Sequence, residues 1–124
     1  MKILHLTLKK KWFDMILSGE KKEEYREIKP YWINRLCWHE FHKQANDLET
    51  LNYCRHNAQN GRFPMDVFNN NYDAICFKNG YAKDAPSMTI EFKGIDVGFT
   101  KPEWSDNWQG EVFKIKLGEI IQSD

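Results

Sequence analysis

Apolar and polar residues alternate at the start of the chain, which predicts a strand. Residues 2–9, KILHLTLK, place three leucines on one face, Leu4, Leu6 and Leu8. The spacing then becomes helical and collects on one side Trp12, Phe13, Ile16 and Leu17. Gly19 is expected to end this helix, because glycine readily adopts the left-handed conformation found past helix ends. A second strand is predicted over residues 21–28, KKEEYREI, and Lys29-Pro30 ends it.

Two helices are predicted before the next strand. Residues 30–43, PYWINRLCWHEFHK, have helical spacing, with an apolar side formed by Ile33, Leu36, Cys37 and Phe41. The leading proline suits the first turn of a helix. A second helix is predicted around residues 47–55, followed by a loop through Asn60-Gly61. We interpret residues 29–65 as an additional helical insertion.

The rest of the chain predicts strands. They are expected within residues 72–80, 87–99 and 111–121, with Asn79-Gly80 as a turn and with bulges or bends at Gly94 and Gly98. The loop 100–110 carries Trp104 and Trp108. The element order β-α-β-α(α)-β-β-β predicts an α+β fold, a small mixed β-barrel with helices over its openings. Residues 1–124 are expected to form one domain.

Composition narrows the class of protein. The hydrophobic fraction of 41% and the aromatic fraction of 15% favour a folded domain over a disordered one. Eighteen basic and eighteen acidic residues cancel, so any site for a polyanion must be a local patch. An odd number of cysteines and no recognisable signal peptide lead us to expect reduced thiols and a cytoplasmic location. No apolar run is long enough for a membrane-spanning helix, so no membrane partner is expected.

Charged residues concentrate in the segment that follows the first helix. In a regular strand Glu24 and Arg26 share one face, and Lys21 falls on the other unless the chain is still turning there. The segment is either a solvated surface strand with weak ion pairs or the wall of a wet cleft. In a cleft, Arg26 could contact a phosphate or carboxylate while Glu24 orients it or accepts a hydrogen bond from a base. Lys21 could act as a base or nucleophile only if it is buried or lies near another cation.

This segment resembles the ASCH domain, a family of PUA-like β-barrels. The family signature Gly-x-Lys-x-x-Glu-x-Arg follows a helix between the first two strands, and here its positions are Gly19, Lys21, Glu24 and Arg26. The resemblance is strongest over residues 3–28 and implies a module that binds RNA or a nucleotide-like ligand in a cleft beside the signature. Lys21, Glu24 and Arg26 would then be the ligand-binding residues.

Some members of that family are amidohydrolases that remove the acetyl group from N4-acetylcytidine. They use the lysine of the signature, a threonine where this chain has Glu24, and a later glutamate. The candidates here by region are Glu91 and Glu103. The resemblance therefore implies a second class of function, a small hydrolase of acylated nucleosides with Lys21 and Glu24 as catalytic residues. A third interpretation is a protein-interaction module, which would show an exposed apolar patch.

Aromatic residues add candidate stacking surfaces for bases. They are Tyr25, Trp32, Trp38, Trp104 and Trp108, each of which could instead pack in the interior. Tyr25 and Trp108 are the preferred stacking candidates for a bound base. A zinc site is not expected, because the spacing of Cys37, His39, His42, Cys54 and His56 matches no common ligand pattern. No cofactor is predicted.

Overall fold

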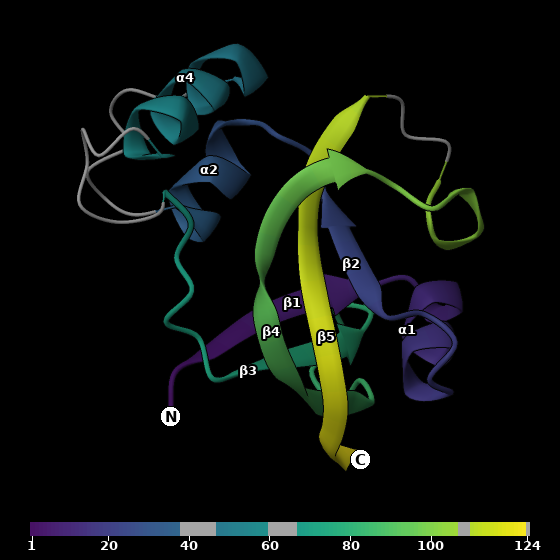
Figure 1. Cartoon of the computed structure of the whole chain (residues 1–124). Helices are drawn as coiled ribbons and strands as arrows, with labels where there is room; N and C mark the ends of the chain where they lie inside the picture. Colours follow the sequence, from purple (N-terminus) through teal and green to yellow (C-terminus); the bar gives the residue numbers. More distant parts are fainter. Residues whose placement is uncertain (38–46, 60–66, 107–109, 124) are drawn as a thin grey trace.

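The structure is a computed structural model that describes residues 1–37, 47–59, 67–106 and 110–123. Three α-helices, one 3-10 helix and five strands lie in these ranges (Figure 1). In chain order they are β1 (Ile3–Leu8), α1 (Lys10–Leu17), β2 (Glu23–Arg26), α2 (Pro30–Leu36), α4 (Leu48–Gln59), β3 (Ala74–Asn79), β4 (Ser87–Phe99), η1 (Pro102–Trp104) and β5 (Glu111–Ser123). The predicted order of elements is confirmed. No helix in these ranges is long and apolar enough to cross a membrane.

The five strands form one curled sheet in the order β1-β3-β4-β5-β2. The pair β1–β3 is parallel and the other pairs are antiparallel. Figure 1 shows the long strands β4 and β5 curving so that the sheet forms about half a barrel. The edge strands β1 and β2 are linked by a side chain, because Arg26 Nη2 on β2 donates to the Thr7 carbonyl on β1 at 3.1 Å. We call this junction the β1–β2 seam.

The predicted faces agree with the buried ones in most elements. Leu4, Leu6 and Leu8 of β1 are buried and enter the same core as Phe13 and Ile16 of α1. The expectation for Leu17 was wrong, since this side chain is 40% exposed. Successive helical residues are rotated by 100°, so Leu17 lies about 140° from Trp12 and turns away from the sheet.

The two glycines expected to interrupt β4 behave differently. Gly94 has a φ of +119° and lies where the register between β4 and β5 shifts, from Phe92↔Leu117 to Ile95↔Ile115. Glycine is well suited to a bulge position with a positive φ, because it has no Cβ atom to clash there. The bulge expected at Gly98 is absent, because this residue pairs with Val112 in regular register.

The helix expected over residues 30–43 ends at Leu36. Cys37 is extended, with φ −116° and ψ 160°, and forms an antiparallel bridge with Phe68. The Asn69 N–H donates to the Leu36 carbonyl at 2.9 Å, so a distant segment takes over the hydrogen bonding at this helix end. The remainder of the expected helix, residues 38–43, lies outside the described residues. The second expected helix is confirmed as α4, and both helices lie at one end of the sheet (Figure 1).

Candidate ligand-binding site

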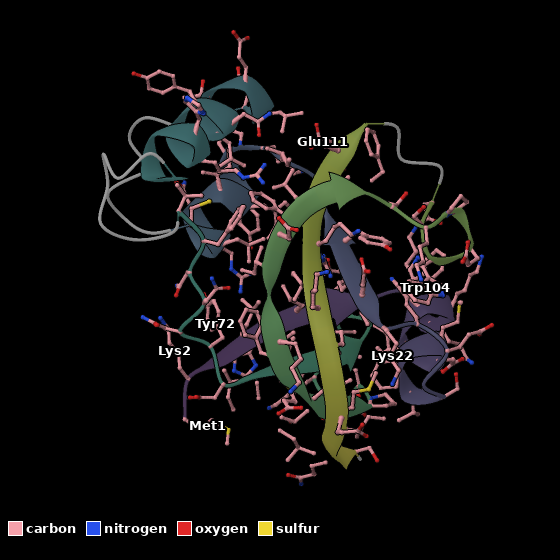
Figure 2. The ribbon with its side chains drawn as sticks, in the orientation of Figure 1. Met1, Lys2, Lys22, Tyr72, Trp104 and Glu111 are labelled. Atoms are coloured by element: carbon pink, nitrogen blue, oxygen red, sulfur yellow. The ribbon has the colours of Figure 1, made fainter. Side chains whose placement is uncertain are left out.

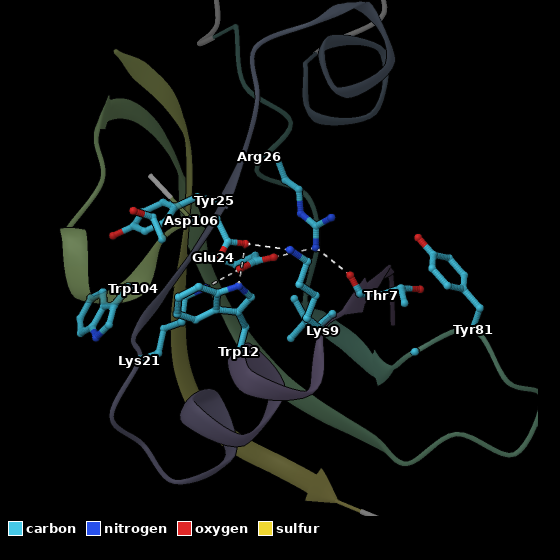
Figure 3. Close-up of a pocket in the computed structure, with 13 residues that line it drawn as sticks. Thr7, Lys9, Trp12, Lys21, Glu24, Tyr25, Arg26, Tyr81, Trp104 and Asp106 are labelled. Atoms are coloured by element: carbon cyan, nitrogen blue, oxygen red, sulfur yellow. Dashed lines mark hydrogen bonds and ion pairs between the residues drawn. The ribbon is translucent and has the colours of Figure 1, made fainter. Parts of the chain in front are cut away.

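A pocket of about 390 Å³ opens between α1, the β1–β2 seam and the loops that follow β3 and β4 (Figure 3). Its walls are Thr7, Leu8, Lys9, Trp12, Lys21, Glu24, Tyr25, Arg26, Gly80, Tyr81, Trp104, Ser105 and Asp106. This volume lies within the range of small-molecule sites, about 300–1,000 Å³. Figure 2 shows Trp104 beside α1, although the two are far apart in the sequence.

Lys21 enters the pocket because it lies in a turn. The Gly19 N–H donates to the Ile16 carbonyl and the Lys21 N–H to the Met15 carbonyl, both at 3.0 Å, and Gly19 has a φ of +86°. The helix therefore ends at a glycine in the left-handed conformation, and the chain turns back so that Lys21 also bonds to its last turn. The strand β2 begins only at Glu23, so Lys21 is exempt from strand alternation. Its side chain can therefore reach the same side as Glu24.

Glu24 binds a cation with each of its carboxylate oxygens. Oε1 lies 2.7 Å from Lys21 Nζ, and Oε2 lies 2.6 Å from Arg26 Nη2. The side chains of Lys21, Glu24 and Arg26 are only 2%, 6% and 16% exposed. Short hydrogen bonds between charged groups are the strong class of hydrogen bond in proteins. We call these three residues the buried triad (Figure 3).

The burial of the triad rules out the interpretation of this segment as a solvated surface strand. Moving an ion out of water costs several kcal/mol, which the attraction between partners offsets only when the geometry is good. Surface pairs avoid this cost and contribute about 0–1 kcal/mol. The interpretation of Glu24 and Arg26 as part of a cleft wall is supported, because both line the pocket, but their low exposure shows that little of either side chain is in contact with water.

Two aromatic rings enclose the Lys21 ammonium. Nζ lies 4.6 Å from the centroid of the Trp12 ring and 5.5 Å from that of Tyr25. A cation close to a ring face is attracted by the ring quadrupole, by up to about 2 kcal/mol when desolvated. The ammonium is therefore held between a carboxylate and two rings, at the inner wall of the pocket.

The rim of the pocket carries a second, more exposed ion pair. Asp106 Oδ2 accepts from Lys9 Nζ at 3.1 Å and from Trp12 Nε1 at 3.2 Å. Burial by itself would raise the pKa of the Asp106 carboxyl. The hydrogen bonds from Lys9 and Trp12 and the charges of Lys9 and Lys11 outweigh it, so this pKa lies below its ordinary value. The hydrogen bond that Trp12 Nε1 donates to Asp106 fixes the orientation of the Trp12 ring.

Tyr25 connects the triad to the loop after β4. Its ring is 2% exposed, and its hydroxyl accepts a hydrogen bond from the Lys101 N–H at 3.1 Å. Burial raises the pKa of Tyr25 to about 12; the Lys101 N–H acts in the opposite direction, and the neighbouring Glu23 carboxylate adds to the increase. The phenol is therefore held in its neutral form.

We expect Tyr25 to make the fold sensitive to high pH. Because its folded pKa is above the unfolded value of about 10, its contribution to stability is fully present below pH 10 and is lost as the pH rises to about 12. Denaturant unfolding between pH 9 and pH 12 should show a steeper loss of stability in the wild type than in Tyr25→Phe. Parallel pH profiles for the two proteins would contradict this assignment.

Four of the five site residues expected from the sequence meet in this pocket. They are Lys21, Glu24, Tyr25 and Arg26. The fifth, Trp108, lies outside the described residues. Trp104 lines the pocket, as a stacking residue should. Neither candidate for the later glutamate lines it: Glu91 pairs with Lys93 at 3.3 Å, and Glu103 is exposed on η1.

Among the pocket residues that reasoning from the sequence missed are Trp12, Tyr81 and Asp106. Trp12 has the helical spacing of a core residue and is buried, yet one side of it faces the pocket. Asp106 and Tyr81 belong to loops with no distinctive pattern. Tyr81 directly follows the predicted Asn79-Gly80 turn, and an aromatic residue beside a turn was the available signal. In the described ranges, no group of three or more His, Cys, Asp or Glu side chains could hold a metal ion.

The chain matches no model of a protein family, no curated protein sequence and no solved structure. The ASCH resemblance thus stays a prediction from the sequence. The case for a function rests on the pocket itself.

Proposed function

We propose that this chain is a PUA-like, ASCH-type domain that binds RNA or a nucleotide-related ligand in the pocket beside the buried triad. The observation that carries the proposal is the triad itself, a set of desolvated charges on the inner wall of a cavity of about 390 Å³. Buried charges of this kind are expensive for a fold to keep, and they concentrate at functional sites. The lining combines them with aromatic rings, as sites for bases and phosphates do.

Each part of the pocket has a role in this proposal. The triad carries two positive charges against one negative charge, so it favours an anionic or carbonyl-rich group in a chain of zero net charge. Arg26 uses one terminal nitrogen for Glu24 and Thr7, and a guanidinium has five N–H donors in all. Its Nε is buried, so the second terminal nitrogen, Nη1, is the group that can bind a phosphate or a base carbonyl. Trp104 and Tyr81 offer ring faces on which a base can stack.

The direct test is binding of short labelled single-stranded RNA and DNA to the wild type and to Arg26→Ala. We expect saturable binding that weakens between about 50 and 200 mM salt, with a preference for RNA if the 2′-hydroxyl is recognised. Arg26→Ala should weaken binding about tenfold or more, since hydrogen bonds to charged groups contribute about 1.5–3 kcal/mol. Fluorescence anisotropy measures both effects.

Two further variants keep this test decisive. Tyr81→Ala removes a ring that is 94% exposed, so it should leave stability unchanged and still weaken binding through reduced stacking. Arg55→Ala is the matched control, because Arg55 is also partly buried and lies 5.6 Å from the Phe68 ring, but it does not line the pocket. Absence of binding to RNA, DNA and single nucleotides by the wild type would overturn the proposal.

One distance supports a second candidate, hydrolysis of an N-acylated nucleoside. A hydrolase of this kind needs a carboxylate within hydrogen-bond reach of a buried lysine, and Glu24 lies 2.7 Å from Lys21 Nζ. Glu24 would take a proton from water while the oxygen attacks the acyl carbon. Lys21 would protonate the leaving nitrogen as its bond to the acyl carbon breaks. Transfer of the proton from Glu24 to Lys21 restores both groups and leaves a carboxylic acid and a free amine.

One measurement distinguishes a hydrolase from a protein that only binds its ligand. Incubation with N4-acetylcytidine, followed by chromatography, should yield cytidine and acetate if the pocket is catalytic. Lys21→Met would abolish turnover in that case, while Tyr81→Ala would mainly raise KM, because Tyr81 is at the open side of the pocket. An unchanged substrate in the presence of bound nucleotide would eliminate the hydrolase and retain the binding function.

A further inference from the structure

A second cavity of about 360 Å³ lies on the other side of Arg26. Arg26, Thr7 and Tyr81 line both cavities, so the two share a wall. In Figure 3 Thr7 and Arg26 lie between Tyr81 on one side and Trp12 and Trp104 on the other. The far wall of the second cavity comes from Lys29 and from one side of α2 up to Arg35 in its last turn, within the insertion 29–65. The ASCH-like signature of the sequence does not extend to these residues.

The second cavity is basic. Its lining includes Arg26, Lys29 and Arg35, and none of its lining residues in the described ranges is a carboxylate. Lys29 is exposed, and within the described ranges its ammonium has no hydrogen-bond or ion-pair partner. The whole chain has no net charge, so this local excess of cations is not a consequence of overall composition.

Its two arginines are held in place before any ligand arrives. Arg26 Nη2 donates to the Thr7 carbonyl at 3.1 Å, and Arg35 Nη2 donates to the His5 carbonyl at 3.0 Å. Both guanidinium groups lie over the Trp32 ring, with its centroid 4.8 Å from Arg26 Cζ and 5.4 Å from Arg35 Cζ. His5 and Thr7 are alternate residues of β1, and alternate residues of a strand are about 6.6 Å apart, so the two cations are anchored about that far apart along β1.

We infer that this cavity binds the phosphodiester that joins the nucleotide in the first pocket to its neighbour in a single-stranded nucleic acid. The inference rests on the proposed function, since the first pocket must hold a nucleotide. Arg35 and Lys29 contact the phosphate oxygens, and Arg26 on the shared wall can contact both nucleotides. The Tyr31 ring is 57% exposed beside these cations and offers a surface on which the neighbouring base stacks.

A run of linked anionic groups fits this surface better than a single small anion does. Two of its cations are anchored along the edge of β1 and the third, Lys29, lies at the start of α2, with an exposed ring, Tyr31, and a partly exposed ring, Trp32, in the same lining. Single-stranded nucleic acids are bound by such combinations of backbone cations and ring faces. The insertion thereby extends the site from one nucleotide to at least two.

The test compares a ribonucleoside 5′-monophosphate with the dinucleotide that adds one phosphodiester and one base. Calorimetric titrations of both probes are made with the wild type, Arg35→Ala and Lys29→Ala, and with Arg55→Ala as the control. The wild type should bind the dinucleotide about tenfold more tightly. Arg35→Ala should remove most of this gain and leave the mononucleotide affinity unchanged. For an oligonucleotide, the slope of log K against log salt should fall by about 0.7 for each phosphate that the variant no longer neutralises.

The outcomes distinguish failure of this inference from failure of the proposed function. Equal affinities for the two probes in the wild type, or an undiminished gain in both Arg35→Ala and Lys29→Ala, would overturn this inference and leave the proposed function intact. Failure of the wild type to bind the mononucleotides, the dinucleotide and the longer RNA and DNA strands would overturn the proposed function and this inference together. Lys29→Ala protects the result against a folding defect, because its exposed side chain makes no capping hydrogen bond to α2.

Discussion

Replacing Glu24 with alanine is expected to lower the free energy of unfolding by about 3–5 kcal/mol, the usual cost of breaking a buried ion pair by removing one partner. Both cations of the triad depend on this one carboxylate, which lies 2.7 Å from Lys21 and 2.6 Å from Arg26. Without it, the buried Lys21 side chain, which is 2% exposed, has lost its carboxylate acceptor. Denaturant unfolding followed by circular dichroism measures the difference in the free energy of unfolding between the wild type and Glu24→Ala.

Two related variants separate charge from packing. Lys21→Met leaves Glu24 paired with Arg26, so it should cost distinctly less than Glu24→Ala. The double variant Lys21→Met/Glu24→Met should also be more stable than Glu24→Ala, because only Arg26 then remains and it is the least buried of the three. Glu20→Ala, at an exposed position, is the control and should change stability by less than about 0.5 kcal/mol. A cost below about 1 kcal/mol for Glu24→Ala would show that the triad is not desolvated.

Trp12→Ala is the other substitution with a large expected effect, both on stability and on binding. The ring is 7% exposed, and removal of a large buried aromatic side chain costs about 3–5 kcal/mol. It also removes the ring beside Lys21 and the N–H donor to Asp106, so the pocket loses its inner wall and part of its rim. Ligand affinity should fall below detection at concentrations that saturate the wild type.

Two further variants, Trp12→Phe and Trp104→Ala, distinguish the role of Trp12 in stability from its role in binding. Trp12→Phe keeps an aromatic ring next to Lys21 but loses the hydrogen bond to Asp106, so it should retain most of the stability and bind with intermediate affinity. Trp104→Ala, at the partly exposed opposite wall, should weaken binding with little loss of stability. Unfolding curves and anisotropy titrations on the same samples give both quantities. If Trp12→Ala were as stable as the wild type, the ring would not belong to the core.

Much of the fold follows from local patterns in the sequence. The leucine alternation in β1, the helical spacing before Gly19 and the strands after residue 72 each report burial on one face, and burial is what organises a small core. The predictions of element boundaries fail where contacts with segments distant in the sequence determine the end of an element. The helix expected over 30–43 ends at Leu36 because Phe68 and Asn69 bind its end through the backbone. The spacing of apolar residues within the helix does not reveal that these distant residues end it.

The candidate site divides in the same way. Lys21, Glu24 and Arg26 lie close together in the sequence, so a motif can mark them together. Asp106 reaches Trp12 from the other end of the chain, and Tyr81 joins through a loop, so only the pairing of the strands brings them to the pocket. The alternation of side chains along a strand also did not determine whether Lys21 lies on the same side of the sheet as Glu24. The helix end at Gly19 decides it, because the strand has not yet begun at Lys21.

The order of the strands has a consequence for how the protein is made. The first two strands pair with β3 and β5, which come from the second half of the chain, and not with each other. Contacts between residues so distant in sequence slow folding, because a long loop must close, at a cost in chain entropy, before these contacts can form. During synthesis Lys21, Glu24 and Arg26 must therefore stay hydrated on the nascent chain until β5 has left the ribosome. The charges that are costly to bury in the finished protein help to keep its incomplete form in solution.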